Sequence, residues 1–444
     1  MSLPFLIWLI LAGLVGSVWL ARTVGVRVVL NRRQVLSSRT YDGPPVPAPR
    51  ISVLVAARDE EDNIEACAAS LLCQDYPDFE VIVIDDRSTD RTPEILRRLR
   101  ETHAEKLSVV TVTSVRDGWF GKTNAMREGV AVSTGQWLCL TDADCTQTSA
   151  NTLSTAMRDA LAHDSDFLSI TPVLEMRTAW ERIIQPVCAL IMVFWFHPEL
   201  VNDPRRKVAY ANGAFMLLRR SCYDAIGGHA GVRAEFNEDV NMARLAKYMG
   251  FRLRMVENSD LYRTRMYTNL REAWRGWSRI FYGCLGTMPR IATAAALVLT
   301  FSVLPWISVL ASLIGWMAFG STAGSPWAAL ALAWACVVVA NQLAVRRIYR
   351  ILGLSSNWSP TYGLGAMFTL GMLLNAMLKA TGASVTTWHG TSYRGSRVLH
   401  GLDDHERGSA APMPAMSGVC PELVPAADTP GLARAGAPAT NTRD

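Results

Sequence analysis

Four long apolar stretches constrain what this 444-residue chain can fold into more than any other feature of its sequence. Each is long enough to cross a lipid bilayer as a helix, and they comprise residues 3–21, 291–317, 327–345 and 361–380. The first lacks the basic start and small-residue cleavage site of a signal peptide. We therefore expect residues 1–22 to be a retained transmembrane anchor, with a cleaved signal as the alternative, and residues 291–380 to form a second transmembrane region.

Basic residues beside these stretches indicate how the chain is oriented. Lys and Arg are enriched at cytoplasmic ends of membrane segments, and such residues follow the first and third stretches: Arg22, Arg27, Arg32, Arg33, Arg346, Arg347 and Arg350. The N-terminus is therefore expected outside, and the long central segment in the cytoplasm of a bacterial-type inner or plasma membrane. Strict alternation would leave the end of the last stretch outside, whereas Lys379, Arg394 and Arg397 favour the inside. A re-entrant or interfacial segment would remove the conflict.

The remaining composition argues against several classes of function. A net charge of +5 without a block of like charges gives no indication of nucleic-acid binding. The nine cysteines show no CxxC pair or metal-ligand spacing, so we interpret them as small buried hydrophobic residues of a reducing compartment. Residues 403–444 are rich in Ala, Pro, Gly and Thr and are expected to be disordered.

Residues 49–282 alternate between short β-branched runs and helical patterns. Strands are expected at residues 51–56, 79–84, 107–113 and 137–141. Alternating elements of this size predict an α/β domain of parallel βαβ units, in which ligands bind beyond the carboxyl ends of the strands. Acidic clusters follow three of these strands: Asp59-Glu60, Asp85-Asp86 and Asp142-Ala143-Asp144. The sequence therefore predicts one polar ligand site at this edge of the sheet.

Asp142 and Asp144 are the strongest single indication of chemistry. Two carboxylates, one residue apart where a buried strand reaches the surface, suit a hard divalent cation such as Mn²⁺ or Mg²⁺. Such a cation is usually held by one or two carboxylates together with substrate phosphates. An Asp-X-Asp by itself more often solvates a loop or caps a helix, so the assignment depends on the neighbouring clusters.

These motifs resemble those of family 2 glycosyltransferases with the GT-A fold. The similarity rests on Ile51-Ser-Val-Leu-Val-Ala-Ala-Arg-Asp-Glu60, Gln74-Asp-Tyr-Pro77, Val83-Ile-Asp-Asp-Arg-Ser-Thr-Asp90 and Thr141-Asp-Ala-Asp144, which arrive in family order. It covers residues 49–282, and membrane-anchored members look most similar: ceramide glucosyltransferases, carotenoid glycosyltransferases and the glycosyltransferase-like proteins of hopanoid clusters. The resemblance implies a cytoplasmic catalytic domain with a mostly parallel sheet and flanking helices, and transmembrane helices at both ends.

The resemblance also implies which residues bind the donor, a nucleotide sugar that we expect to be a UDP-sugar. They are Ala57, Asp59, Glu60, Asp86, Lys122, Asn124, Asp142, Arg275 and Arg279, with Asp142 and Asp144 holding the metal. Lys122 and Asn124 belong to a Gly-bracketed turn before a helix, which can approach phosphate or nucleoside. The family's Gln-X-X-Arg-Trp motif is absent, and Arg275 or Arg279 would clamp the diphosphate in its place.

A second acidic motif, Glu235-Phe-Asn-Glu238-Asp239, precedes a helical stretch at residues 240–249. It resembles the Glu-Asp motif of inverting members. By this resemblance Asp239 is the general base that takes the proton of the acceptor hydroxyl, and Glu238 orients it. Such a base works best when burial raises its pKa. An Asp at a helix N-terminus is also an ordinary cap.

The acceptor side is expected to include Asn212, Gly213, Trp277 and Trp388. Asn-Gly is also an ordinary turn, and a Trp/Arg helix such as the one containing Trp277 is equally typical of a membrane interface. Trp388 begins a segment that resembles the Trp-X-Gly-X-X-Tyr tail of lipid-glycosylating members.

An apolar run near residues 183–198 is too short to span a bilayer. We predict that it lies in the membrane interface beside the acceptor site, with a buried core helix as the alternative. Together these expectations describe a metal-dependent, inverting hexosyltransferase that moves a sugar to a hydroxyl of a membrane lipid. A processive polysaccharide synthase and a catalytically silent membrane scaffold on the same fold remain alternatives.

Overall fold

The structure is a computed structural model of the chain. It describes residues 2–320, 325–381, 386–388, 391–394 and 397–399, with the backbone alone for residues 26–32 and for the three short segments after residue 381. These residues belong to one unit that ends at Gly401. The tail that we expected to be disordered, residues 403–444, lies outside the described residues.

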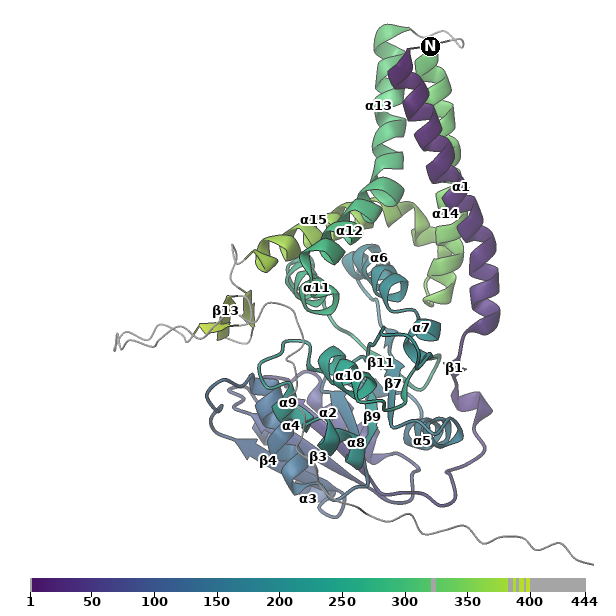
Figure 1. Ribbon diagram of the computed structural model, residues 1–444. Coiled ribbons are helices and arrows are strands. Elements are labelled where there is room, and N and C mark those ends of the chain that lie inside the picture. The colour runs from purple at the N-terminus through teal and green to yellow at the C-terminus, as the bar shows by residue number, and fades with distance from the viewer. Residues whose placement is uncertain (1, 321–324, 382–385, 389–390, 395–396, 400–444) are drawn as a thin grey trace, which may run out of the picture. The chain divides into compact units, whose positions relative to one another are not determined.

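An eight-stranded sheet forms the centre of the α/β domain (Figure 1). Its strands lie in the order β1-β10-β7-β9-β5-β2-β3-β4 and are parallel, except that β9 runs antiparallel to both β5 and β7. The bounds are β1 (Val35–Leu36), β2 (Ile51–Ala57), β3 (Phe79–Asp86), β4 (Leu107–Val112), β5 (Trp137–Asp142), β7 (Phe167–Thr171), β9 (Met216–Arg219) and β10 (Leu253–Asn258). The mostly parallel α/β fold expected from the sequence is confirmed.

Helices cover both faces of this sheet, which explains why its central strands are continuously apolar. Successive side chains of a strand point to opposite faces, so Leu54 and Ile82 belong to one buried cluster, and Val53 and Val81 to the other. The first face packs on α4 (Gly121–Val132) and α10 (Glu238–Tyr248), and the second on α2 (Ile64–Leu72), α3 (Thr92–Thr102) and α5 (Thr152–Ala162).

Shorter elements complete the domain. A three-stranded sheet is ordered β6-β11-β8, and its first strand, β6, follows directly after β5 along the chain. Its strands and the short helices are β6 (Cys145–Gln147), β8 (Val173–Leu174), β11 (Tyr262–Thr264), η1 (Ser38–Thr40), α7 (Pro198–Asn202), α8 (Arg220–Ala225) and α9 (Gly228–Gly231). A further small sheet near the chain's end contains β12 (Thr386–Trp388), β13 (Thr391–Arg394) and β14 (Arg397–Leu399).

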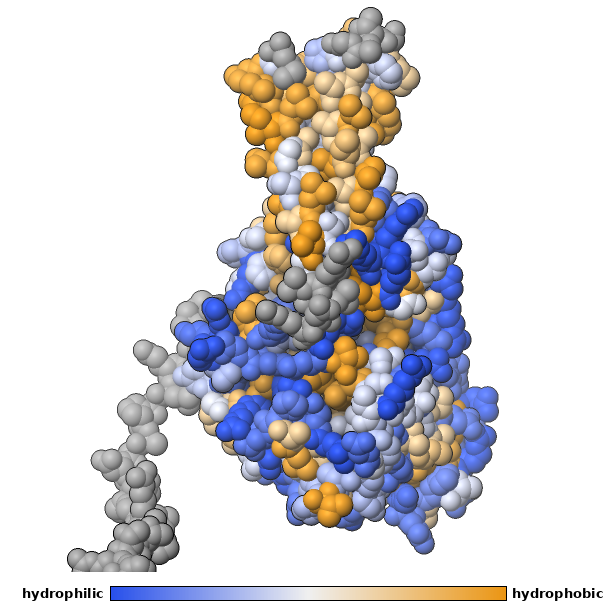
Figure 2. All heavy atoms as spheres, turned by 90° about the vertical axis from the view of Figure 1, so that its right-hand side faces the viewer, coloured by the Kyte–Doolittle hydropathy of each residue, from blue (hydrophilic) through white to orange (hydrophobic). Residues whose placement is uncertain are grey.

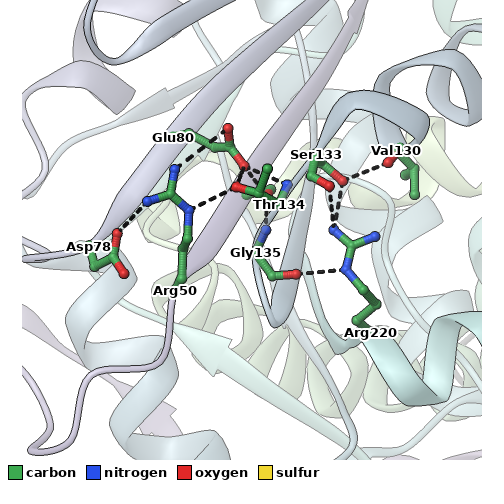
Figure 3. Close-up of polar contacts among 9 residues, drawn as sticks. Arg50, Asp78, Glu80, Val130, Ser133, Thr134, Gly135 and Arg220 are labelled. Carbon is green, nitrogen blue, oxygen red and sulfur yellow. Dashed lines mark hydrogen bonds and ion pairs between the residues drawn. The ribbon is translucent and has the colours of Figure 1, made fainter.

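A polar network ties together the loops at the amino ends of β2, β3 and β5 (Figure 3). Arg50 pairs with Asp78 at 2.8 Å and donates to the Thr134 hydroxyl at 2.9 Å. Glu80 accepts hydrogen bonds from the Thr134 amide and hydroxyl, at 2.8 and 2.7 Å, and from Ser52 at 2.7 Å. This network lies at the amino ends of the strands. The acidic clusters lie at the opposite edge of the sheet, at the carboxyl ends.

Three long helices form a column above the domain in Figure 1: α1 (Leu3–Arg32), α13 (Leu304–Phe319) and α14 (Pro326–Ile351). Apolar side chains are exposed along all three, for example Ile7, Ile314 and Val339, and Figure 2 shows this column as the apolar part of the surface. Five helical segments are long and apolar enough to cross a membrane: Leu3–Gly25, Ala179–Asn202, Met288–Phe319, Pro326–Ile351 and Ser356–Ala380. The four stretches expected from the sequence are among them.

The remaining helices lie between this column and the sheet (Figure 1). They are α6 (Ala179–Trp195), α11 (Leu270–Leu285), α12 (Met288–Val298), the π-helical η2 (Leu299–Val303), η3 (Ser356–Thr361) and α15 (Tyr362–Ala380). In Figure 1 α15 lies across the base of the column rather than along it. This placement favours the interfacial solution to the topology conflict, because the end of α15 then stays on the side of the α/β domain.

The segment near residues 183–198, expected to be too short to span a bilayer, belongs to a helical segment, Ala179–Asn202, that is long and apolar enough to do so, so that expectation was wrong. A capping box between Thr178 and Glu181 begins α6, and the helix continues through Pro186. Its buried face packs against α15 and α11, while Trp180, Val193 and Phe194 are exposed. The helix therefore has one protein-facing and one apolar exposed face, as an interfacial helix requires.

Candidate functional site

The three acidic clusters predicted to meet do so because their strands are neighbours in register. β2 lies between β3 and β5, and Ala57 pairs with Asp85 while Ala56 pairs with Asp142. Ala57 itself is buried at the end of β2. The loops that follow these strands consequently open at the same edge of the sheet.

The first two loops are joined by hydrogen bonds to the Asp59 carboxylate. The amide and hydroxyl of Thr89 donate to it at 2.7 and 3.1 Å, and the Asp59 amide donates to Ser88 at 3.1 Å. Asp59 and Arg87 both have positive φ values, 55° and 59°, which are uncommon away from glycine. The loops after β2 and β3 therefore hold each other in a conformation that neither would adopt freely.

Asp86 is almost fully buried at the end of β3, where it pairs with Arg87 at 2.8 Å. Gly121, the first residue of α4, lies directly against this carboxylate. A Cβ atom at Gly121 would be 2.7 Å from Asp86 Oδ2, so only glycine allows the start of α4 to come this close. The turn before α4 is thereby placed beside the β3 loop, as the predicted cradle requires.

Asn124 also lies in the first turns of α4 and is buried. Its side-chain amide donates to the Ser114 carbonyl at 3.3 Å, and its oxygen accepts from the Arg116 amide at 3.4 Å. These contacts shape the loop after β4 around a hollow of about 260 Å³ that Asn124 helps to line.

Lys122 links the acidic cluster after β5 to the second acidic motif. Its ammonium lies 2.7 Å from Asp142 Oδ1 and 2.6 Å from Glu238 Oε1. Burial alone would lower the pKa of Lys122, but these two carboxylates hold it well above its ordinary value. The lysine is therefore charged at any physiological pH and neutralises part of the acidic cluster.

Asp144 lies deeper than Asp142 and experiences the negative charge around it. Burial, with the charges of Asp142 and Glu60 adding to its effect, raises the pKa of Asp144 to about 7. Burial and the charge of Asp142 raise the pKa of Glu60 as well. Concentrated negative charge of this kind fits a divalent cation bound by Asp142 and Asp144. Among the described residues, no group of three or more His, Cys, Asp or Glu side chains is arranged to hold a metal.

Asp239 occupies the first turn of α10, and two backbone amides hold its carboxylate. Gly213 N donates to Oδ2 at 2.9 Å, and Val240 N donates to Oδ1 at 2.7 Å. Burial, reinforced by the charge of Glu238, nevertheless raises the pKa of Asp239 to about 7. This value suits a group that must accept a proton near neutral pH.

Gly213 brings the two halves of the site together. A Cβ atom built on it would lie 3.4 Å from Asp239 Oδ2, 3.5 Å from Lys122 Nζ and 3.6 Å from Asp142 Oδ2. Asn212 keeps this turn in place, since its side-chain oxygen accepts from the Ala214 amide at 3.0 Å. The carboxylate of Asp142, the ammonium of Lys122 and the carboxylate of Asp239 therefore surround one small space, beside which Gly213 has no side chain.

The segment that precedes Asp239 is attached to the start of α4. The carbonyl of Arg233 accepts hydrogen bonds from the Phe120 amide and the Thr123 hydroxyl, both at 2.9 Å. The rings of Phe120 and Phe236 lie 4.5 Å apart. Neither contact could be predicted from the spacing of residues along the sequence. Both connect the segment before Asp239 to the start of the helix that contains Lys122.

The residues of α11 differ in their positions. Arg275 is exposed and lines a hollow of about 490 Å³ together with Leu270, Arg271 and Trp274. Trp277 is only 4% exposed, and its indole donates to Gln185 on α6 at 3.0 Å. Its acceptor role stays a prediction, since in this position it packs between two helices. Trp388 belongs to β12, and its side chain lies outside the described part of the chain.

Tyr267 is a residue of this region that the sequence interpretation missed. Burial raises the pKa of its phenol, the neighbouring guanidinium of Arg279 opposes this shift, and the charge of Asp144 adds to it. Tyr267 packs against α11, where a Cβ atom on Gly276 would lie 2.0 Å from the Tyr267 ring. It follows β11 by a few residues and belongs to none of the motifs, so only the tertiary structure reveals its position.

Comparison with known proteins shows which proteins the α/β domain is similar to. Residues 52–227 match the model of glycosyl transferase family 2. The 4,4'-diaponeurosporenoate glycosyltransferase of Staphylococcus aureus (strain USA300) is 26% identical over 298 residues, which cover 64% of this chain and 76% of that protein. A solved structure of the mannosyltransferase PcManGT from Pyrobaculum calidifontis, in complex with GDP-Man and Mn²⁺, has a TM-score of 0.52 and 20% identity and covers 85% of this chain and 99% of its own.

The family match includes the acidic clusters, Lys122 and Gly213 but ends before Asp239. The likeness to PcManGT shows the fold and extends beyond the matched region into the helices. The chain therefore contains a family 2 glycosyl transferase domain with a GT-A-like fold, and it is a glycosyltransferase.

Proposed function

We propose that the protein is a metal-dependent, inverting glycosyltransferase that moves a sugar from a nucleotide sugar to a hydroxyl of a membrane lipid. One observation supports this most strongly. Asp239, Lys122 and Asp142 all lie within 3.6 Å of the position that a methyl group on Gly213 would occupy. A base, a cation and a metal-binding carboxylate around one space are the groups that such a transfer needs.

The donor would bind along the carboxyl edge of β2, β3 and β5. Ala57, Asp59, Glu60, Asp86 and Asn124 are the proposed nucleoside and ribose contacts. Asp142 and Asp144 would hold Mn²⁺ or Mg²⁺, which in such sites neutralises the charge that develops on a departing diphosphate. Lys122 is placed to contact the same phosphates, and Arg279 is a further candidate through its position next to Tyr267. A UDP-sugar is the donor that we propose.

The reaction itself would depend on Asp239. Its carboxylate is oriented by the amides of Gly213 and Val240, and its raised pKa lets it take the acceptor proton near neutral pH. The acceptor oxygen would attack the anomeric carbon from the face opposite the diphosphate, so the product has inverted configuration. Glu238, bound to Lys122, would keep the lysine beside the base.

A lipid acceptor is supported by the surface next to the site. The outer side of α15 exposes Leu364, Met367, Leu374 and Leu378, and α6 exposes Val193 and Phe194. Both helices contact α11. Arg279 of α11 interacts with Tyr267, whose phenol also experiences the charge of Asp144. A hydroxyl of a membrane lipid could therefore approach Asp239 from this side, and the relative that acts on 4,4'-diaponeurosporenoate is consistent with an apolar acceptor.

The test is sugar transfer by the full-length protein in detergent. A panel of UDP- and GDP-sugars is offered with a membrane-lipid extract and with Mn²⁺, Mg²⁺ or a chelator. We expect a new glycolipid with one donor class, and none with chelator. Asp239→Asn should abolish it, whereas Asp224→Asn, an exposed aspartate of α8, should not. Full activity in chelator would contradict metal dependence, and activity in Asp239→Asn would contradict the assigned base.

A further inference from the structure

Asn237 immediately precedes Glu238 and Asp239, at the position where α10 begins. An asparagine at such a position usually accepts a hydrogen bond from an amide in the first turn of its own helix, but the side chain of Asn237 makes no such bond. Its amide group instead donates to the Cys284 sulfur on α11, at 3.1 Å. A side chain directly before the proposed base therefore attaches α10 to another helix.

Gly283 makes this attachment close. A Cβ atom built on Gly283 would lie 2.1 Å from Asn237 Oδ1 and 2.6 Å from Asn237 Cγ, so no larger residue fits while Asn237 stays in place. Glycine is disfavoured within a helix, and Gly283 belongs to the last turn of α11. We interpret Gly283 as the residue that lets the start of α10 touch α11.

Arg244 provides a second attachment of α10 to the same residue of α11. Its guanidinium donates to the Cys284 carbonyl at 2.8 Å and to the side-chain oxygen of Asn241 at 3.0 Å. The side chain of Asn241 in turn donates to the Asn237 carbonyl at 3.1 Å. Positions 237, 241 and 244 share one face of a helix, so this whole face of α10 is fixed at Cys284.

Cys284 lies at the end of α11, directly before a candidate membrane helix. Gly286 ends α11 in the left-handed conformation, with a φ of 70°, and the segment Met288–Phe319 that follows is long and apolar enough to cross a membrane. The hydroxyl of a membrane lipid reaches Asp239 only if α10 lies at the right distance from that membrane. The contacts at Cys284 set this distance, because they join α10 to the chain directly before the segment.

We propose that Asn237 and Arg244 are positioning residues, which hold Asp239 at the place where the hydroxyl of a membrane lipid arrives. The Asp239 carboxylate itself is bound by two other groups, both backbone amides. A change at Asn237 would therefore move the base without removing its own hydrogen bonds. The proposal rests on the proposed function, because the two residues matter for catalysis only if Asp239 is the base.

The experiment compares variants of the full-length protein in detergent. Asn237→Ala removes the contact with α11, Gly283→Ala places a methyl group in it, and Arg244→Met removes the second attachment. In the double variant Asn237→Ala/Gly283→Ala the clash is absent, because the three atoms nearest to that methyl all belong to the part of Asn237 that alanine lacks. The controls are Asn357→Ala, at an exposed asparagine of η3, and Gly13→Ala, where a Cβ atom meets nothing within 4 Å.

We expect Asn237→Ala, Gly283→Ala and Arg244→Met each to lower kcat for transfer to lipid by about 10- to 100-fold, since a displacement of about 1 Å can slow an enzyme about 100-fold. The double variant should be more active than Gly283→Ala alone, and both controls should keep the wild-type rate. Two properties should not change in any variant. They are the midpoint of the pH–rate profile and the affinity for UDP or GDP, whichever the active donor contains, measured with Mn²⁺ by calorimetry.

Wild-type rates in Asn237→Ala and Arg244→Met would overturn the proposal. A double variant no more active than Gly283→Ala would do the same, as would a loss of rate that weaker nucleotide binding explains. Thermal unfolding shows whether each variant folds, and Asn237→Ser replaces Asn237→Ala if the latter does not.

Failure of the proposed function has a different signature. A wild-type protein that forms no glycolipid contradicts that function, and the positioning role with it. Normal transfer that Asp239→Asn abolishes and Asn237→Ala leaves intact contradicts the positioning role alone.

Discussion

At the scale of single residues, the site depends on groups whose charges the protein controls. Burial raises the pKa of both Asp239 and Asp144 to about 7, but the neighbouring charges that add to this effect differ. For Asp239 the added charge is that of Glu238, and for Asp144 the added charges are those of Asp142 and Glu60. Lys122 joins the two groups by binding Asp142 and Glu238. Burial is the main cause of both raised values, and no local sequence motif specifies burial.

The proposed role of Asp239 as the base predicts how transfer depends on pH. A base must be deprotonated to act, and with a pKa of about 7 its active form becomes a minority below neutral pH. We expect kcat/KM for the acceptor to rise about tenfold per pH unit below the pKa and to level off above it. Initial rates across a pH series measure this profile. A flat profile from pH 5 to pH 8, in an enzyme that stays folded, would exclude Asp239 as the base.

Gly213→Ala tests the space between the catalytic groups. The added methyl would make ordinary contacts of 3.4 to 3.6 Å with Asp239, Lys122 and Asp142, so we expect an unchanged melting temperature. It would occupy space next to the reacting groups, and a displacement of about 1 Å can slow an enzyme about 100-fold. Transfer rates test this, with Gly13→Ala, where a Cβ atom meets nothing within 4 Å, as the control. Equal activity of the two variants would mean that the reactants do not approach Gly213.

At the scale of elements, a polar network connects the loops at the edge of the sheet opposite the proposed site. Glu80 is the centre of that network and receives three hydrogen bonds (Figure 3). Burial alone would raise its pKa, but hydrogen bonds from Ser52 and Thr134, with the charge of Arg50, lower it. The loop before β5 is thereby held, and with it the strand that ends at Asp142.

Glu80→Gln should therefore destabilise the domain by about 1–2 kcal/mol at pH 7, because charged hydrogen bonds become neutral ones. A carboxyl group with a lowered folded pKa stabilises the protein above its unfolded pKa, about 4.3, and this contribution is lost as the pH falls through the folded value. Denaturant unfolding at pH 7 and below pH 4 measures the difference. The deficit should shrink in acid, and it should be absent in Glu94→Gln, a carboxylate that is 60% exposed.

At the scale of the whole molecule, three helices form a column and α15 lies across its base, an arrangement that is compatible with the basic residues on which the topology conflict rested. Arg347 of α14 donates to the carbonyl of Thr23 on α1 at 2.5 Å, so the basic ends of both helices lie at the same end of the column. α15 lies across that end in Figure 1. The charges near residues 346–350 and Lys379 can then share one side of the membrane.

This topology predicts which cysteines an impermeant maleimide reaches in intact cells. A Ser2→Cys residue, at the far end of α1, should be labelled from outside. Cys73, which is exposed on the α/β domain, should be labelled only after permeabilisation, because we expect that domain in the cytoplasm. A Cys73→Ser protein identifies the native signal. Labelling of Cys73 in intact cells would place the domain on the outer side.

Local pattern was sufficient for four strands of the central sheet, β2 to β5, and for the edge of the sheet at which the acidic clusters lie. The strands predicted at residues 51–56, 79–84 and 137–141 end in the structure at residues 57, 86 and 142, within two residues of the prediction. The same reasoning brought Asp59, Asp86 and Asp142 to one edge, and α/β architecture followed. The extent of α6 was underestimated, because a capping box at Thr178 begins the helix before its apolar run.

The sequence by itself determined the α/β domain, the apolar helices and the set of acidic groups, since these depend on periodicity and on residue type. Only the tertiary structure decided that Lys122 binds both Asp142 and Glu238, that Trp277 donates to Gln185 of α6, and that Tyr267 packs against Gly276 of α11. These contacts join residues far apart in the chain. Their geometry comes from how helices pack on the sheet and on each other, which spacing along the sequence does not encode.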